Sequence, residues 1–504
     1  MPTISKVPSV VSLARPSAGH LTALALAAAV VAWGGPGVAL AQAPAGASGP
    51  SARLAGVDAH RDRAAKTPSI NASDIRIVLA RTYLQTGGPK NIPLPTVSQL
   101  IGGKRVVLPP CPAAKNRSLS LNVAGADRAF SRRTLRRAIE MMREEGRIPR
   151  RGAFPYCAWW LPVDVRTLNI AFPDAAAVYW AMPLYVPAQR QVIITGTYPD
   201  ARYISFAVYN QKLDPYQYTP PGSRHAINSY LADYQIRPDP GSLNPWRTPG
   251  AQPGGSYTIT IKRHPRARER NALPLLQDPT ASQSATRVSI PLPPPCGRSG
   301  APACTLPGVF TSPPAEDQSS VFSNPDNTYL PAIIRPNQRN EVWVVRGKLP
   351  RTPHGESPVP WPNPRYQLRY WSMCTAIYAR PYPTITNGGC LVDNDVVTDK
   401  KGFYTIVVST GRARPSTATT QNGVNWLRVR PGVANLLIVR NMLGAGFPYS
   451  TQNVTKDGSW QTAYLSMRDY YPSITVQCTT AHYLASGWQG CVAPKGSGVI
   501  GGGG

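Results

Sequence analysis

The segments ARYISFAVYN (201–210) and LRYWSMCTAI (368–377) both carry the pattern Arg-Tyr-x-Ser inside an apolar run. Arg202-Tyr203-x-Ser205 in the first segment becomes Arg369-Tyr370-x-Ser372 in the second. Both runs are rich in the aromatic and β-branched residues that favour strands. Two copies of one strand indicate that the chain contains a duplicated β-rich unit.

Further blocks repeat in the same order around this strand. YWAMPLYVPAQRQVIITG (179–196) parallels YLPAIIRPNQRNEVWVVRG (329–347), and both contain Pro-x-Gln-Arg and end in glycine. The spacing of Leu231, Asp233, Ile236 and Asp239 recurs at 391–399, and YTITI (257–261) recurs as YTIVV (404–408). Four matched blocks in one order predict an internal duplication with two copies.

The composition favours short strands joined by long ordered loops. Of 504 residues 55 are proline, which breaks helices and central strands, yet 42% are hydrophobic. Each copy needs a second layer to bury its apolar face. We therefore expect a mostly β protein with two duplicated β-sandwich-like domains and long Pro-rich loops. One basic amphipathic helix is expected at 131–146, where apolar residues recur at helical spacing.

The N-terminus resembles an export signal. The apolar run LTALALAAAVVA (21–32) precedes Ala39-Leu40-Ala41, a small-residue cleavage site. This pattern predicts a signal peptide over 1–41, with an uncleaved anchor as the alternative, and no transmembrane segment after cleavage. The protein is therefore expected to be exported, either periplasmic or extracellular.

Composition shifts divide the remaining chain. We expect a flexible linker at 42–74, a first β-rich domain at 75–262, a Pro-rich basic linker at 263–328, a second β-rich domain at 329–492 and a disordered Gly-rich tail at 493–504.

Eight cysteines in an exported chain favour disulfides. We expect sequential pairing, although the count alone leaves other connectivities open. The predicted pairs are Cys111–Cys157, Cys296–Cys304, Cys374–Cys390 and Cys478–Cys491. No CxxC pair occurs, so we expect no zinc site. We also expect no other metal and no cofactor.

The net charge of +29 implies attraction to anionic partners. After export these are acidic polysaccharide, lipid headgroups or cell wall, and no nucleic acid is expected. The helix at 131–146 carries a basic face that is either a docking surface or a solvated helix face. Its members are Arg132, Arg133, Arg136, Arg137 and Arg143.

The residues that survive in both copies are the candidate ligand site. A duplicated Arg–Asp pair is either a structural clamp, because arginine binds carboxylate bidentately, or a polar site with a tyrosine as stacking face. Three tryptophans in loop-like contexts, Trp246, Trp361 and Trp426, either stack on sugars or belong to the core. The candidates are Arg202, Tyr203, Asp233, Asp239, Trp246, Arg369, Tyr370, Asp393, Asp399 and Trp426. The run DNDVVTD (393–399) also permits a calcium interpretation, although it lacks the twelve-residue calcium loop.

No catalytic motif stands out, and the catalytic residues stay unknown. GxSxG and HExxH are absent, and a glycosidase would need only two facing carboxylates. The sequence favours a non-enzymatic binding or envelope-associated protein that contacts anionic surface polymer or polysaccharide. The alternatives are a carbohydrate-active hydrolase and a structural or assembly subunit with a protein partner.

Two stretches, 179–210 and VNWLRVRPGVANLLIVRNMLG (424–444), resemble exported bacterial proteins of unknown function with paired β-rich domains. The matching residues are Arg202, Tyr203, Ser205, Tyr209, Asn425, Trp426, Leu427 and Arg440. The resemblance implies fold and export and carries no activity with it.

Overall fold

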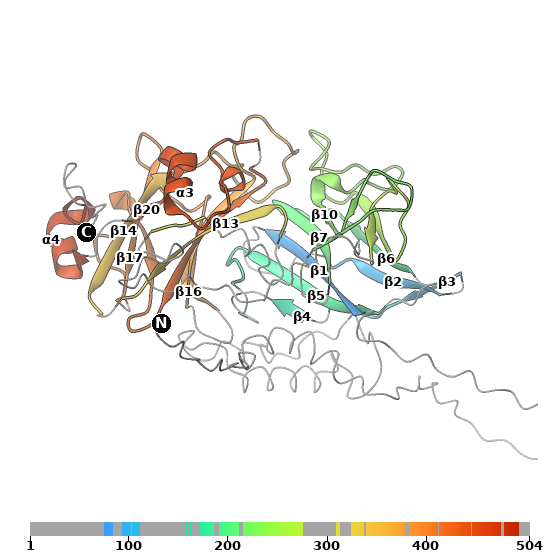
Figure 1. The fold of residues 1–504 in the computed structure, drawn as a ribbon, viewed down its shortest axis with the longest axis horizontal. Coiled ribbons are helices and arrows are strands. Elements are labelled where there is room, and N and C mark those ends of the chain that lie inside the picture. Colours follow the sequence, from blue (N-terminus) through green and yellow to red (C-terminus); the bar gives the residue numbers. More distant parts are fainter. Residues whose placement is uncertain are drawn as a thin grey trace, which may run out of the picture.

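A computed structural model describes two β-rich units that lie side by side along the long axis (Figure 1). The first unit comprises the described residues up to 275, and the second comprises those from 309 onward. The described residues are 75–83, 93–101, 103–110, 158–159, 161–163, 165, 169, 172–185, 191–210, 215–275, 309–312, 324–336, 339–377, 384–411, 413–444, 446–474 and 478–492.

Two five-stranded sheets form the first unit. One has the order β10 (Tyr230–Ala232), β7 (Tyr203–Tyr209), β1 (Ile75–Tyr83), β5 (Ala177–Tyr185) and β4 (Leu161–Val163). The other has the order β12 (Ala272–Pro274), β11 (Ser256–Lys262), β6 (Gln191–Thr197), β2 (Thr96–Ile101) and β3 (Lys104–Val107). A separate hairpin joins β8 (Gln217–Tyr218) to β9 (Ile227–Asn228), and the 3-10 helix η3 (Asp233–Gln235) follows β10.

The second unit repeats this two-sheet plan. One sheet has the order β13 (Asn327–Ile334), β19 (Asn435–Met442), β15 (Tyr370–Ile377) and β16 (Thr384–Val392). The other has the order β18 (Asn425–Arg428), β17 (Phe403–Ser409), β14 (Glu341–Lys348) and β20 (Ser473–Ile474), and β21 (Cys478–Thr479) also pairs with β14. Short helices complete it: η4 (Thr420–Asn422), η5 (Thr451–Asn453), α3 (Trp460–Met467), η6 (Arg468–Tyr470) and α4 (Thr480–Gly490).

Each unit has its own hydrophobic core between its two sheets. The first core joins residues such as Phe206 of β7 to Ile259 of β11, and the second joins Met373 of β15 to Ile406 of β17. The alternating burial of β6 and β11 follows from one face packing inward and the other facing solvent. The predicted pair of duplicated β-sandwich-like domains is therefore confirmed.

One strand of the sheet comes from a different part of the chain in each unit. β1 pairs with β5 and β7, and β19 pairs in the same way with β13 and β15. β1 precedes the other strands of its unit, whereas β19 follows most of the strands of its unit. The same sheet position is therefore filled from the N-terminal side in one copy and from the C-terminal side in the other.

The structure places two predicted boundaries differently. β12 (272–274) pairs in parallel with β11, so the first unit extends past residue 262 into the stretch expected to be a linker. β13 begins at Asn327, just before the predicted start at 329. The expected signal peptide at 1–41, linker at 42–74, helix at 131–146 and tail at 493–504 lie outside the described residues.

The helices α3 and α4 were not predicted from the sequence. Their side chains show no strong apolar stripe, and their starts depend on side-chain caps from Ser459 and Thr479. Such caps satisfy backbone N–H groups locally and leave little periodic signal. None of the described helices combines the length and the apolar character needed to cross a membrane.

Two of the predicted disulfides are confirmed, Cys374–Cys390 and Cys478–Cys491. The first joins neighbouring strands β15 and β16 at directly opposed positions. The second joins β21 to the end of α4. The other four cysteines lie outside the described residues.

The repeated glycines are explained by a repeated tyrosine. A Cβ on Gly196 would lie 2.5 Å from Tyr257 Oη, and one on Gly347 would lie 2.6 Å from Tyr404 Oη. Both tyrosines are fully buried, and burial raises the pKa of each phenol. Glycine is required in β6 and β14 because a buried ring packs directly on the backbone.

We predict that Gly347→Ala destabilises the second unit by about 1–3 kcal/mol, because the buried Tyr404 ring cannot move aside. Chemical denaturation of the purified protein measures this. The control is Gly446→Ala, since a Cβ there meets nothing within 4 Å, and its effect should stay within about 0.5 kcal/mol. Equal effects of the two substitutions would contradict the packing argument.

Candidate functional site

The repeated arginines and aspartates form reciprocal ion pairs across the junction of the two units. Arg202 donates from Nη1 to both carboxylate oxygens of Asp393 at 2.7 Å. Arg369 donates from Nη2 to Asp233 Oδ2 at 3.0 Å. All four side chains are 0% exposed. Each arginine therefore binds the aspartate of the opposite copy.

Burial dominates the electrostatics of these pairs. It raises the pKa of Asp233 to about 7, although Arg369 and two backbone N–H groups oppose the rise. Burial likewise raises the pKa of Asp393 and lowers that of Arg369. Arg369 lies over the Trp361 ring, 5.5 Å from its centroid, which supplies a second stabilising contact for this guanidinium.

The adjacent tyrosines reach across the junction in the same reciprocal way. Tyr203 donates to Asp326 Oδ2 at 2.6 Å, and Tyr370 donates to Asp174 Oδ1 at 2.8 Å. Both rings are fully buried in an apolar cluster with Ala177 and Met442. Neither tyrosine offers a stacking face to a ligand from solvent.

The sequence reasoning missed Asp174 and Asp326. Both follow a proline directly before the first strand of a repeat, as Pro173-Asp174 and Pro325-Asp326. This repeated dipeptide was a usable signal, since it precedes the block at 179–196 and its counterpart at 329–347 in the same order.

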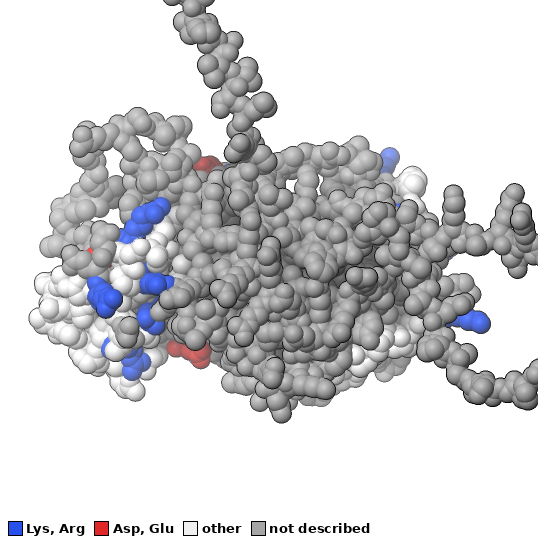
Figure 2. Space-filling view, turned by 90° about the horizontal axis from the view of Figure 1, so that it is seen from below, with Lys and Arg blue, Asp and Glu red and all other residues white. Residues whose placement is uncertain are grey.

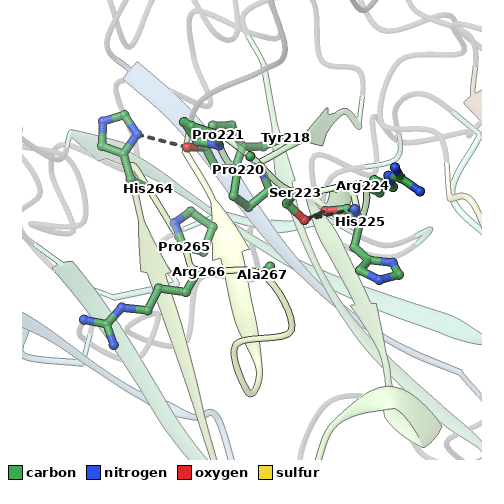
Figure 3. Close-up of a pocket in the computed structure, with 11 residues that line it drawn as sticks. Tyr218, Pro220, Pro221, Ser223, Arg224, His225, His264, Pro265, Arg266 and Ala267 are labelled. Atoms are coloured by element: carbon green, nitrogen blue, oxygen red, sulfur yellow. Dashed lines mark hydrogen bonds between the residues drawn. The ribbon is translucent and has the colours of Figure 1, made fainter.

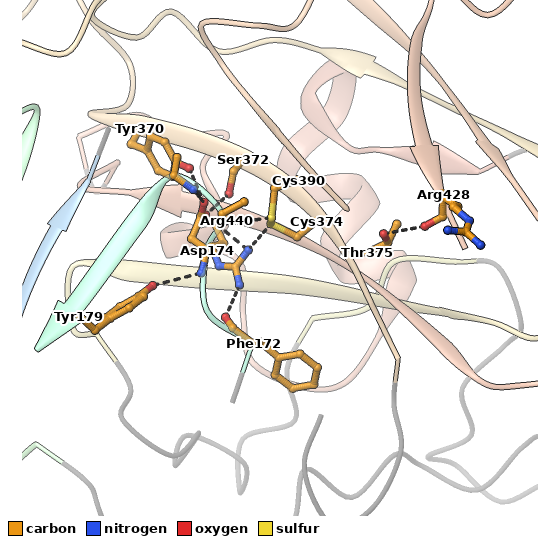
Figure 4. Close-up of a disulfide and its surroundings, with 12 residues drawn as sticks. Phe172, Asp174, Tyr179, Tyr370, Ser372, Cys374, Thr375, Cys390, Arg428 and Arg440 are labelled. Atoms are coloured by element: carbon orange, nitrogen blue, oxygen red, sulfur yellow. Dashed lines mark hydrogen bonds and ion pairs between the residues drawn. A yellow bond between two sulfur atoms is a disulfide. The ribbon is translucent and has the colours of Figure 1, made fainter. Parts of the chain in front are cut away.

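A disulfide lies beside one of these aspartates (Figure 4). Asp174, Cys374 and Cys390 have donor atoms within 4.8 Å of one another. Arg440 donates to Cys374 Sγ at 2.8 Å and lies 3.5 Å from Asp174. Because the sulfurs are bonded to each other and a guanidinium is adjacent, this cluster suits a structural role and does not suit a second cation.

The other candidates are not members of these ion pairs. Trp246 is 0% exposed and donates to the backbone oxygen of Arg202, so it belongs to the core of the junction. Trp426 is half-buried and donates to Ser409 Oγ. Asp239 accepts from Thr258, and Asp399 pairs with Arg346 near the surface.

Arginines bind two of the three carboxylates of the DNDVVTD run. Asp393 pairs with Arg202, and Asp399 pairs with Arg346 at 2.9 Å. Hydrogen bonds from the backbone of Phe403 and from Arg346 lower the pKa of Asp399. The arrangement does not bring these oxygens together around one ion.

An open hollow of about 700 Å³ lies on the first unit (Figure 3). Two loops build it, one between β8 and β9 and one after β11. Its walls are prolines, with basic and imidazole side chains at the edges, and none of its described lining residues is acidic. The lining includes Tyr218, Pro220, Pro221, Arg224, His225, His264, Pro265 and Arg266.

Hydrogen bonds order the two histidines of the hollow. Tyr218 Oη lies 3.2 Å from His264 Nδ1, and Arg268 Nη2 lies 2.9 Å from His225 Nε2. A guanidinium only donates, so His225 Nε2 is the acceptor in this contact. Figure 3 shows Arg224 and Arg266 pointing outward on different sides. Such flanking cations suit an extended anionic chain better than one small anion.

Exposed arginines gather at the end of each unit that is distant from the junction. In the first unit they are Arg224, Arg266 and Arg268, which we call the first basic end. In the second they are Arg335, Arg339 and Arg414, with the half-buried Arg428 and Arg430, which we call the second basic end. Figure 2 shows Lys and Arg side chains grouped on the described surface of the second unit, at left.

Backbone pairing brings the members of the second basic end together. Gly432 N donates to Pro336 O, and Thr410 N donates to Glu341 O. These bonds join the β13–β14 turn, the end of β17 and the segment after β18.

The predicted basic face of the helix at 131–146 cannot be placed beside these ends, because its five arginines, Arg132, Arg133, Arg136, Arg137 and Arg143, lie outside the described residues.

Comparisons with known proteins identify no family. No family model matches the chain, and no curated protein matches it. An uncharacterised protein from Burkholderia cenocepacia is similar at 13% identity over 58% of this chain and 76% of that one, with a TM-score of 0.32. A protein from Vibrio parahaemolyticus is similar at 15% identity over 30% of each chain, with a TM-score of 0.19. These scores support no inference about function.

We predict that the buried pair Arg202–Asp393 is strongly coupled. Arg202→Met alone should cost about 3–5 kcal/mol, because Asp393 is left charged and unpaired in the junction. Arg202→Met with Asp393→Leu should cost less than the two single changes added together. Denaturation of the four proteins of this double-mutant cycle gives the coupling energy.

The exposed pair Arg346–Asp399 is the matched control, since the same substitutions there should couple by about 0.5 kcal/mol or less. A coupling at Arg202–Asp393 as small as that of the control would contradict a structural role for the junction pair.

Proposed function

We propose that this is an exported, non-enzymatic binding protein that contacts acidic polysaccharide of the cell envelope through its basic ends. The observation that carries the proposal is the gathering of exposed arginines at loops distant from the junction. The net charge of +29 supports it, because such a field attracts polyanions. The two disulfides are compatible with an oxidising compartment.

Arginine suits a carboxylate-bearing sugar chain. Its planar guanidinium donates two parallel hydrogen bonds to one carboxylate and stays charged at any physiological pH. At the first basic end the acid Glu269 is already bound by Lys262 at 2.6 Å. At the second, Glu341 is 4% exposed. Each end therefore has more arginines than these acids, and the net charge that an approaching chain meets is positive.

The positions of the acids favour binding over hydrolysis. A glycosidase needs two carboxyl groups that face one cleft. The repeated aspartates, Asp233 and Asp393, are fully occupied by arginines inside the junction. The hollow of the first unit presents prolines, histidines and arginines. A hydrolase remains the alternative that an activity assay addresses.

We predict that the exported form, residues 42–504, is retained on immobilised alginate, a uronic acid polymer, and not on dextran, a neutral one. Retention should weaken at least roughly tenfold between low and high salt, because salt screens surface charges. Surface plasmon resonance at several salt concentrations measures it.

Each other outcome is informative. Salt-insensitive retention on dextran would move the site away from the arginines and make hydrolysis the next assay. No retention on either polymer would contradict the proposal and leave an assembly role with a protein partner. Replacing Arg132, Arg133, Arg136, Arg137 and Arg143 by glutamine tests separately whether the expected helix contributes.

A further inference from the structure

A basic connection between neighbouring strands recurs in the two units, with one of its arginines at each basic end. The connection from β11 to β12 contains Arg266-Ala267-Arg268, and that from β17 to β18 contains Arg412-Ala413-Arg414. In both units this connection joins two parallel neighbouring strands. Arg268 and Arg414 are exposed, and Arg412 lies outside the described residues. An exposed basic connection has therefore been retained in both copies.

A second arginine repeats in the turn between equivalent strands. Pro-x-Gln-Arg ends at Arg190 after β5 and at Arg339 after β13. The structure describes Arg339, which is exposed beside the start of β14, and Arg190 lies outside the described residues. Two independent loops thus carry repeated arginines, while much of the loop sequence around them differs between the copies.

The junction directs the two basic ends away from each other. β7 and β15 both start at the junction, since Arg202 and Arg369 precede them. In each unit β11 or β17 starts on the same side and ends away from it, because Ser256 lies opposite Thr197 and Phe403 lies opposite Lys348. The connections after β11 and β17 therefore leave their strands at the outer ends of the molecule, before they return to the parallel strands β12 and β18.

Figure 1 is consistent with this placement. The β2–β3 hairpin, which continues past Gln191 at the outer end of β6, lies at far right. Helix α4 follows β21, which pairs with the outer end of β14, and lies at far left. The reciprocal buried ion pairs hold the units in this relative orientation.

We propose that the protein is bivalent: each basic end binds a separate acidic polysaccharide chain, so that one molecule bridges two chains. This inference rests on the proposed function and adds cross-linking to it. Two sites in one rigid body cannot both lie on the same short stretch of polymer when they face in opposite directions. When both ends bind chains of the same polysaccharide network, the protein is held more tightly than by either end alone, although no new contact forms.

The test uses beads that carry alginate, the purified exported form, and soluble fluorescent alginate added afterwards. Retention of protein on the bead reports binding, and capture of fluorescence reports bridging. The first variant is Arg224→Ala, Arg266→Ala and Arg268→Ala. The second is Arg335→Ala, Arg339→Ala and Arg414→Ala. All six side chains are exposed, so both variants should fold.

Each variant should still be retained on the bead through its intact end but should capture at least roughly tenfold less fluorescent alginate than the wild type. A mixture of the two variants should capture no more than either variant alone. The charge-matched control is Arg247→Ala, Arg365→Ala and Arg468→Ala, three exposed residues outside the basic ends, which should capture like the wild type.

The outcomes separate this inference from the proposed function. Capture by both single-end variants at the wild-type level would overturn bridging by the two ends, while retention on the bead would leave the binding function intact. Loss of bead retention in one variant and no effect in the other would show a single site and also overturn bridging. Absence of retention for the wild type would instead contradict the proposed function itself.

Discussion

The relative position of the two units depends on one reciprocal arrangement of buried charges. Arg202 binds Asp393, and Arg369 binds Asp233, with every side chain removed from water. A buried ion pair contributes little net stability, yet losing one partner is costly because the other charge stays desolvated. The pairs therefore specify the relative orientation of the units. The apolar cluster around them stabilises the contact through the hydrophobic effect, which is not directional.

The two copies are equivalent at the junction and different around it. The loop from β14 to β15 is much longer than that from β6 to β7, and its Gly355 oxygen accepts from Arg202. The loop after η3 is the longer one in the first unit, and its Trp246 oxygen accepts from Trp361 N. Each unit thus adds a long loop that contacts the other unit at the junction. These two loops differ, so the two copies are not interchangeable there.

Some of this was readable from residues alone. The four repeated blocks predicted two sandwich-like units, and nearby cysteines in a disulfide-favouring chain predicted Cys374–Cys390 and Cys478–Cys491. The structural interpretation of the repeated Arg–Asp pair as a clamp agrees with the burial of Arg202 and Asp393. The sequence did not predict which aspartate each arginine binds, because the same repeated residues are compatible with a pair within one copy and with a pair between the copies. The helices α3 and α4 were missed because their starts depend on local caps, and Asp174 and Asp326 were missed because a repeated dipeptide is short.

By itself the sequence determined the class of fold, the duplication, the basic charge and which residues recur, since these depend on composition and on periodic patterns along the chain. The tertiary structure decided which recurring residues are buried and which face water. Arg202 and Arg268 are the same residue type, but one lies inside a junction and the other on an outer loop. That difference arises from contacts between residues far apart in the chain, such as Arg202 with Asp393, and no local pattern contains it.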